Sequence, residues 1–192
     1  MRDLDIRREL LIRVKSLHSG EQGTRIVEEL GLCQGAARID VAAVNGSLRG
    51  YEIKSERDTL CRLPGQCEAY NKSLDFVTIV ACATHLDKIR ELVPEWWGIW
   101  SAQDDGQSVH LEIERREQRN PEVNPLAVAQ LLWREEALQV LDQWELTAGF
   151  RSKTRAQIWQ RLVEALTIDE LGDSVRARLK ARKGWRAVSP QA

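Results

Sequence analysis

Two carboxylates and an amine stand close together in the sequence, on two short apolar segments. They are Asp40, Glu52 and Lys54. Carboxylate oxygens are the ligands that Mg²⁺ prefers, and a lysine beside them can orient the attacking water or offset the charge that develops on a phosphate. This set of groups predicts metal-dependent hydrolysis of phosphodiester bonds. The alternative for Glu52 and Lys54 is a solvated strand face, because charged side chains usually lie on the surface.

The two apolar segments, residues 39–44 and 48–54, are predicted to pair as an antiparallel hairpin. The Asn-Gly dipeptide between them is a strong signal for a tight turn. Side chains alternate across a strand, so Glu52 and Lys54 share one face of the second strand.

A helix is predicted after the hairpin, beginning at Pro64, because proline fits the first turn of a helix better than its interior. Gln66 and Tyr70 follow, four residues apart. This spacing puts both side chains on one helical face.

These residues and spacings resemble the PD-(D/E)xK nuclease superfamily. The two acids and the lysine match its D…(E/D)-x-K core, and the segment Gln66-Cys-Glu-Ala-Tyr70 is similar to the Q-x-x-x-Y motif of its RecB-like branch. Ile39 stands where the superfamily pattern has proline, a departure that many members share. The match covers roughly residues 1–83. The R-I-D-V, G-Y-E-I-K-S and P-x-W-W-G-I segments also resemble a group of small, uncharacterised bacterial proteins of this superfamily.

The resemblance implies a fold and an activity. The fold would be α/β, with a restriction-endonuclease-like core in the order αβββαβ and a mixed central sheet flanked by helices. The activity would be that of a Mg²⁺-dependent deoxyribonuclease, with Mn²⁺ as a substitute. The implied roles are metal binding for Asp40, Glu52 and the Ile53 carbonyl, catalysis for Lys54, and positioning of the DNA or the metal site for Gln66 and Tyr70.

Upstream glutamates are candidates for a further metal ligand, since members of the superfamily often add one from the first helix or strand. Residues 25–32 are short and lie between two glycine-containing loops, so a strand is favoured over a short helix. Glu28 and Glu29 would then project to opposite faces, and at most one of them could reach the metal. The order of candidates is Glu29, Glu28 and Glu9.

Basic residues near the predicted site could clamp a DNA backbone. The candidates are Arg57, Arg62 and Lys72, with surface salt bridges as the alternative. A second basic region, residues 151–192, holds ten basic and four acidic side chains. It is predicted either as a phosphate-facing surface or as a solvated helix face.

DNA is thus the expected partner, with single- and double-stranded forms left open, and a homodimer is left open as well. The alternative function is a non-catalytic module that retains the nuclease fold and binds nucleic acid or protein.

A polar linker with two prolines, residues 116–125, is predicted to divide the chain. The nuclease-like core would cover residues 1–118, and a helical C-terminal extension residues 119–192. Further expected elements are helices at 3–17 and 84–92, strands at 75–83, 94–100 and 109–115, and, after the linker, helices at 126–144, 154–166 and 168–179.

Aromatic and sulfur-containing side chains are predicted to be mostly structural. Trp133, Trp144, Trp159 and Trp185 are expected in the core of the extension, with stacking on exposed bases as the alternative. The four cysteines are expected to be small buried apolar residues rather than ligands of an iron–sulfur cluster.

Composition places the chain among ordinary globular proteins. It has 192 residues, of which 43% are hydrophobic and 30% charged, enough to bury a core without disulfides. No apolar run approaches the ~18 residues that span a membrane, and the N-terminus is too charged for a signal peptide. We therefore expect a cytoplasmic protein that does not enter a membrane.

Overall fold

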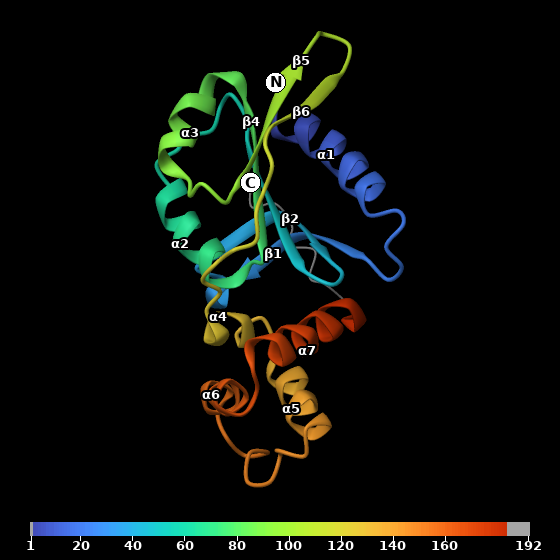
Figure 1. Ribbon diagram of the computed structural model, residues 1–192, viewed down its shortest axis with the longest axis vertical. Coiled ribbons are helices and arrows are strands. Elements are labelled where there is room, and N and C mark those ends of the chain that lie inside the picture. The colour runs from blue at the N-terminus through green and yellow to red at the C-terminus, as the bar shows by residue number, and fades with distance from the viewer. Residues whose placement is uncertain (1, 184–192) are drawn as a thin grey trace.

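A six-stranded mixed sheet organises the molecule, in the order β1-β2-β3-β4-β5-β6. The computed structural model describes residues 2–183. One helix covers one face of the sheet, two helices cover the other, and a group of helices extends one end (Figure 1). The elements are α1 (Asp3–Leu17), β1 (Arg25–Leu32), η1 (Cys33–Gly35), β2 (Ala37–Val44), β3 (Leu48–Lys54), α2 (Leu63–Ser73), β4 (Phe76–Cys82), η2 (Ala83–His85), α3 (Leu86–Leu92), β5 (Gly98–Asp104), β6 (Val109–Arg115), α4 (Pro125–Ala129), α5 (Arg134–Gln143), α6 (Arg155–Ala165) and α7 (Ile168–Ala181).

The sheet combines antiparallel and parallel pairs. Strands β1, β2 and β3 form an antiparallel meander, β3, β4 and β5 are parallel, and β6 returns antiparallel to β5. Parallel neighbours need crossover connections, which α2 and α3 supply. The predicted α/β class and the order α-β-β-β-α-β are therefore confirmed for α1 to β4. The strand predicted at 94–100 is wrong in its bounds, because β5 begins only at Gly98.

The two faces of the sheet are buried by different helices. Ile6 and Leu10 of α1 pack in one cluster with Tyr51 and Ile53 of β3. The opposite face, under α2 and α3, belongs to a larger cluster that includes Trp97. Glu52 and Lys54 therefore face away from α1 and toward α2, as the alternation along β3 predicts.

The helical extension packs directly on the end of the sheet layer. Leu74, at the end of α2, shares a hydrophobic cluster with Val128 of α4 and Leu171 of α7. The linker is tied to the same region, since the buried Asn120 donates to the carbonyl oxygens of Asn71 at 2.6 Å and Leu74 at 2.8 Å. The single helix predicted for residues 126–144 is wrong: α4 and α5 are separate helices.

The tryptophans of the extension do not share one environment. Trp159 is buried at 2% exposure, as predicted, but Trp133 and Trp144 are 46% and 37% exposed. The last two stand at the two ends of α5 as its N-cap and C-cap, where side chains leave the packed helix face. Trp185 lies outside the described residues.

Among the cysteines, Cys67 and Cys82 are buried and Cys33 is half-buried, but Cys61 is exposed, so the prediction of burial is wrong for Cys61.

No helix within residues 2–183 combines the length and the apolar character needed to cross a membrane.

Replacing Gly50 with alanine is expected to destabilise the fold by about 1–3 kcal/mol, the usual cost of overpacking a core. A Cβ at this position of β3 would lie 2.5 Å from Leu74 Cδ1 and 3.1 Å from Ile39 Cγ1. Urea denaturation measures the loss. Gly46→Ala is the matched control, because a Cβ there meets no atom within 4 Å; equal stability of the two variants would contradict this packing.

Candidate active site

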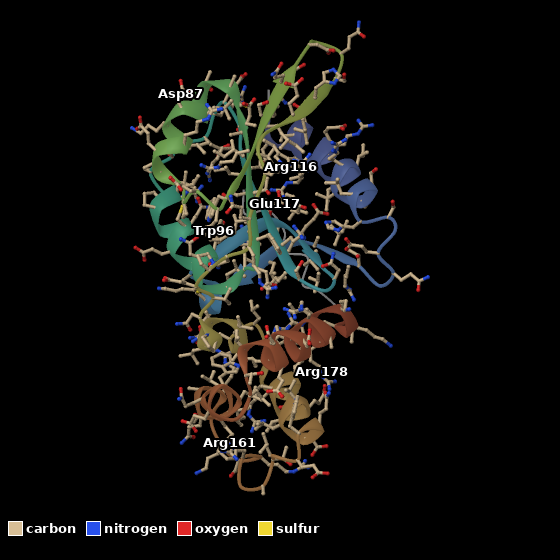
Figure 2. All side chains as sticks on the ribbon, viewed as in Figure 1. Asp87, Trp96, Arg116, Glu117, Arg161 and Arg178 are labelled. Atoms are coloured by element: carbon tan, nitrogen blue, oxygen red, sulfur yellow. The ribbon has the colours of Figure 1, made fainter. Side chains whose placement is uncertain are left out.

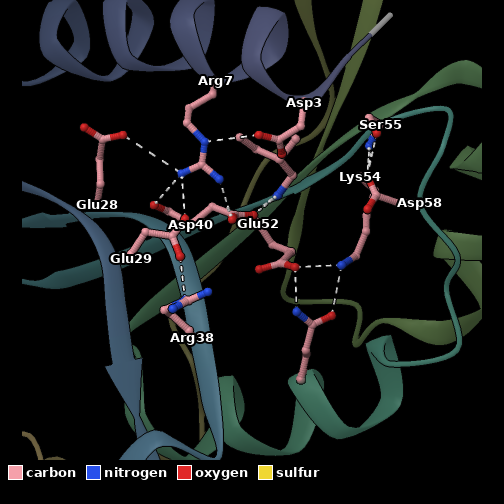
Figure 3. Close-up of polar contacts among 12 residues, drawn as sticks. Asp3, Arg7, Glu28, Glu29, Arg38, Asp40, Glu52, Lys54, Ser55 and Asp58 are labelled. Atoms are coloured by element: carbon pink, nitrogen blue, oxygen red, sulfur yellow. Dashed lines mark hydrogen bonds and ion pairs between the residues drawn. The ribbon is translucent and has the colours of Figure 1, made fainter. Parts of the chain in front are cut away.

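The candidate site lies at the open end of the β2–β3 hairpin. Backbone pairing of the two strands ends at Val41 opposite Tyr51. Beyond that pair, the side chain of Asp40 replaces the strand partner, because its Oδ2 accepts a hydrogen bond of 2.7 Å from the Ile53 N–H. Asp40 is thereby fixed beside Glu52 on the neighbouring strand, and Figure 3 shows the two carboxylates close together.

The carboxylate of Glu52 accepts hydrogen bonds from three side chains. Its Oε1 accepts from Lys54 Nζ at 2.7 Å and from Gln66 Nε2 at 2.6 Å, and its Oε2 accepts from the Tyr70 hydroxyl at 2.6 Å. Lys54 Nζ also donates to Gln66 Oε1 at 3.0 Å. Gln66 thus contacts both charged groups of β3 and Tyr70 contacts Glu52, so the two motif residues share one face of α2, as the spacing of four residues predicts.

Glu52 and Lys54 are far more buried than charged side chains on an ordinary solvated strand face. Glu52 and Lys54 are each only 3% exposed, so the alternative of a solvated face is wrong. Removing two charges from water is costly unless they are paired and fully hydrogen-bonded. The structure meets that condition with an amide and a phenol that the sequence provides on the next helix.

The electrostatics of the site favour a cation. Burial raises the pKa of Glu52, the nearby charge of Asp40 raises it further, and Lys54 opposes both. Burial also raises the pKa of Asp40, against the Ile53 N–H and Arg7. Burial and the charge of Glu52 raise the pKa of Tyr70 far above its usual range, so its hydroxyl stays a neutral donor. Two ionised carboxylates at this place therefore carry a free-energy cost that a bound cation would relieve.

Arg7 is the site residue that the sequence did not reveal. From α1 its Nη2 donates to Asp40 Oδ1 at 2.7 Å, and its Nη1 lies 3.0 Å from Glu29 Oε1. Further contacts reach Asp3 at 3.3 Å and Glu28 at 4.0 Å. One guanidinium thus joins four acidic side chains (Figure 3). The only sequence signal is its place next to Ile6 on α1, whose buried residues face the sheet.

The two strand glutamates were predicted to point to opposite faces, and this prediction is wrong. Both side chains lie within reach of the same arginine, Glu28 at 4.0 Å and Glu29 at 3.0 Å. The backbone at Glu29 has φ of 58°, a left-handed conformation that non-glycine residues seldom adopt. This local departure from extended geometry breaks the alternation of side chains along β1.

A cavity of about 910 Å³, here called the site cavity, connects these groups to the surface. Among the predicted residues, those that line it are Asp40, Glu52, Ile53, Lys54, Gln66, Glu29 and Arg62. Tyr70 stands behind Glu52, fully buried. Four further predicted residues do not line the cavity. Glu28 contacts Arg7 from β1, Arg57 is exposed on the turn after β3, Glu9 lies on α1, and the Lys72 carbonyl accepts from Asn124 N of the linker.

The donor set suits a hard divalent cation only in part. Asp40, Glu52 and a strand carbonyl offer oxygen ligands of the kind that Mg²⁺ and Mn²⁺ take. Within residues 2–183, however, no group of three or more acidic, histidine or cysteine side chains is arranged to hold a metal ion. One further acid in the lining, Glu29, is paired with Arg7 and with Arg38 Nε at 2.5 Å.

The metal-free protein is expected to lose stability as pH rises above the ordinary carboxylate pKa of about 4. Between that value and the raised pKa of Glu52 in the folded site, the unfolded chain has released more protons than the folded chain. The folded state binds more protons there, so the free energy of unfolding falls with rising pH. Thermal melts from pH 4 to 8 should show a flatter profile for Glu52→Gln than for the parent. The exposed Glu68→Gln on α2 should keep the parent profile, and equal slopes for all three proteins would contradict the raised pKa.

Comparison with known proteins gives one family. Residues 2–187 match the family described as bacteriophage P4 protein cII. Protein cII of Enterobacteria phage P4 is 27% identical over 157 residues, which cover 82% of this chain and 59% of that protein. The chain thus matches less than two thirds of the length of this curated relative. No solved structure shows a significant match.

Proposed function

This chain belongs to the family of bacteriophage P4 protein cII, and we propose that it is a metal-dependent nuclease of the PD-(D/E)xK type that hydrolyses phosphodiester bonds in DNA. The supporting observation is the meeting of Asp40, Glu52 and Lys54 at one open cavity, with Gln66 and Tyr70 bonded to the buried carboxylate. The element order α1-β1-β2-β3-α2-β4 agrees with the core that this superfamily shares. We keep a cytoplasmic location within this proposal, since DNA is the expected substrate.

Each residue then has a distinct role. Asp40 and Glu52 would hold Mg²⁺ or Mn²⁺ together with the Ile53 carbonyl. When bound, such a metal activates water and offsets negative charge on the phosphate. Lys54 is almost fully buried and donates to Glu52 and Gln66, so its ammonium is a preorganised positive charge that would stabilise negative charge developing on the phosphate.

The remaining polar groups keep this arrangement rigid. Gln66 accepts from the ammonium of Lys54 and donates to Glu52, so it fixes the distance between them. Tyr70 donates to the other oxygen of Glu52 and restricts rotation of the carboxylate. Arg62, exposed at the lining of the site cavity, is suitably placed to contact a phosphate of the DNA backbone.

Cleavage assays with a variant of Asp40 test this proposal directly. Plasmid and labelled oligonucleotides would be incubated with Mg²⁺ or Mn²⁺, and the parent protein should cut them while Asp40→Asn should not. Asp87→Asn is the matched control, because Asp87 is exposed on α3, away from the site (Figure 2). Cleavage that persists in Asp40→Asn would reject the assignment.

One observation favours a second candidate function. Arg7 already supplies a positive charge to Asp40 and Glu29, which is what a site without metal would require. The chain would then be a module that binds nucleic acid or protein without cutting it. This candidate predicts DNA binding without cleavage in any divalent metal, and binding that Glu52→Gln leaves unchanged.

A further inference from the structure

A second cavity continues the site cavity toward the helical extension. It has a volume of about 680 Å³, and we call it the Trp133 groove. The two cavities share part of their lining, namely Glu29, Gly31, Gly35 and Arg38. An extended polymer bound in the groove could therefore continue along the protein surface to the carboxylates of Asp40 and Glu52.

The far wall of the groove consists of aromatic rings and guanidinium groups. Trp133 is 46% exposed, and the Arg182 guanidinium lies 4.2 Å from its ring centroid. Arg155 lies over the buried Trp159 at 4.6 Å. An exposed indole beside stacked arginines is the kind of surface on which unpaired bases stack.

The charge of the groove suits a polyanion despite the acidic body of the protein. Arg38 and Arg155 are both exposed in its lining. The acid in that lining, Glu29, is already paired with Arg7 and Arg38. Arg38 keeps 52% of its side chain exposed although it is paired with Glu29, whereas Arg182 is buried against Glu136 and Trp133 and is not accessible to a phosphate.

We propose that the Trp133 groove binds a single strand of DNA, with Trp133 stacking on a base and Arg38 and Arg155 contacting phosphates. In a duplex the base faces are already stacked on one another, so an exposed indole gains its contact only from an unpaired base. The delivery of that strand to Asp40 and Glu52 rests on the proposed nuclease function. The binding itself does not.

Binding measured without divalent metal separates the two claims. Fluorescence anisotropy with a labelled oligothymidylate and with a duplex of the same length, both in EDTA, should show tighter binding of the single strand. Trp133→Ala should weaken that binding by roughly tenfold. Trp144→Ala should leave it unchanged, because Trp144 is also exposed but lines neither cavity.

The arginines give an independent readout. Arg38→Gln and Arg155→Gln should each reduce the slope of log affinity against log salt by about 0.7, the value for one phosphate contact on a single strand. Three outcomes would each overturn the proposal that this groove binds single-stranded DNA. They are equal binding of duplex and single strand, equal effects of the two tryptophan variants, and unchanged salt slopes. If the expected binding results are obtained while Asp40→Asn still cuts DNA, the groove proposal stands and the assignment of cleavage to the Asp40 site fails.

Discussion

Replacing Lys54 with methionine is expected to lower the rate of DNA cleavage by about a hundred- to a thousandfold, the range for loss of one preorganised electrostatic group. Methionine keeps the apolar stem of the side chain and removes only the ammonium. Glu52 retains its hydrogen bonds from Gln66 and Tyr70, so two of the three hydrogen bonds to its carboxylate are preserved. Single-turnover cleavage of a labelled oligonucleotide at saturating Mg²⁺ measures the effect.

The control for Lys54→Met is Lys72→Met. Lys72 is exposed at the last turn of α2 and does not line the site cavity. We expect parent-like cleavage from this variant, and thermal melts should show that both variants are folded. A Lys54→Met protein that is folded and cuts DNA at the parent rate would remove lysine from the proposed mechanism.

Replacing Arg7 with glutamine is expected to destabilise the metal-free protein by about 2–3 kcal/mol, because it leaves the partly buried Asp40 without its charge partner. The guanidinium donates to Asp40 at 2.7 Å and also offsets Glu29. Thermal or urea denaturation in EDTA measures the loss. Burial alone would lower the pKa of Arg7, but the charges of Asp40 and Asp3 raise it above its usual range, so this cation is present at every accessible pH.

Arg7→Gln also distinguishes a metal site from a site in which Arg7 alone offsets the negative charge of the carboxylates. If Asp40 and Glu52 bind Mg²⁺, adding the metal should raise the melting temperature of Arg7→Gln more than that of the parent, since ligand binding to the folded state stabilises it. Arg8→Gln is the control, because Arg8 is exposed on the same helix. Equal metal effects in all three proteins would favour the non-catalytic module.

The parts of the site that could be predicted are those that depend on local sequence. The Asn-Gly turn sets the register of β2 and β3, so Asp40 and Glu52 had to be neighbours. The spacing of Gln66 and Tyr70 fixed them on one face of α2. Each of these relations spans few residues, and strand alternation or helical periodicity is enough to derive it.

The parts that could not be predicted depend on tertiary packing. Arg7 reaches Asp40 across 33 residues of sequence, only because α1 packs against the same face as Tyr51 and Ile53. The left-handed backbone at Glu29 breaks the alternation on which sequence reasoning relied.

The helical extension shows the same limit. A continuous apolar pattern over residues 126–144 suggested one helix, whereas the chain breaks between α4 and α5 and exposes Trp133 in the lining of the Trp133 groove. Arg161 and Arg178 belong to α6 and α7 of this extension (Figure 2). How these helices meet the sheet layer is decided by long-range contacts that no local pattern encodes.

A crystal structure grown in Mn²⁺ is the most direct measurement of the central claim, because the anomalous signal of manganese identifies the ion without ambiguity. The nuclease assignment predicts a peak within coordination distance of the carboxylates of both Asp40 and Glu52, with the Arg7 guanidinium drawn away from Asp40. A map with no peak there, and with Arg7 still bonded to Asp40 at a Mn²⁺ concentration that supports full cleavage, would contradict it.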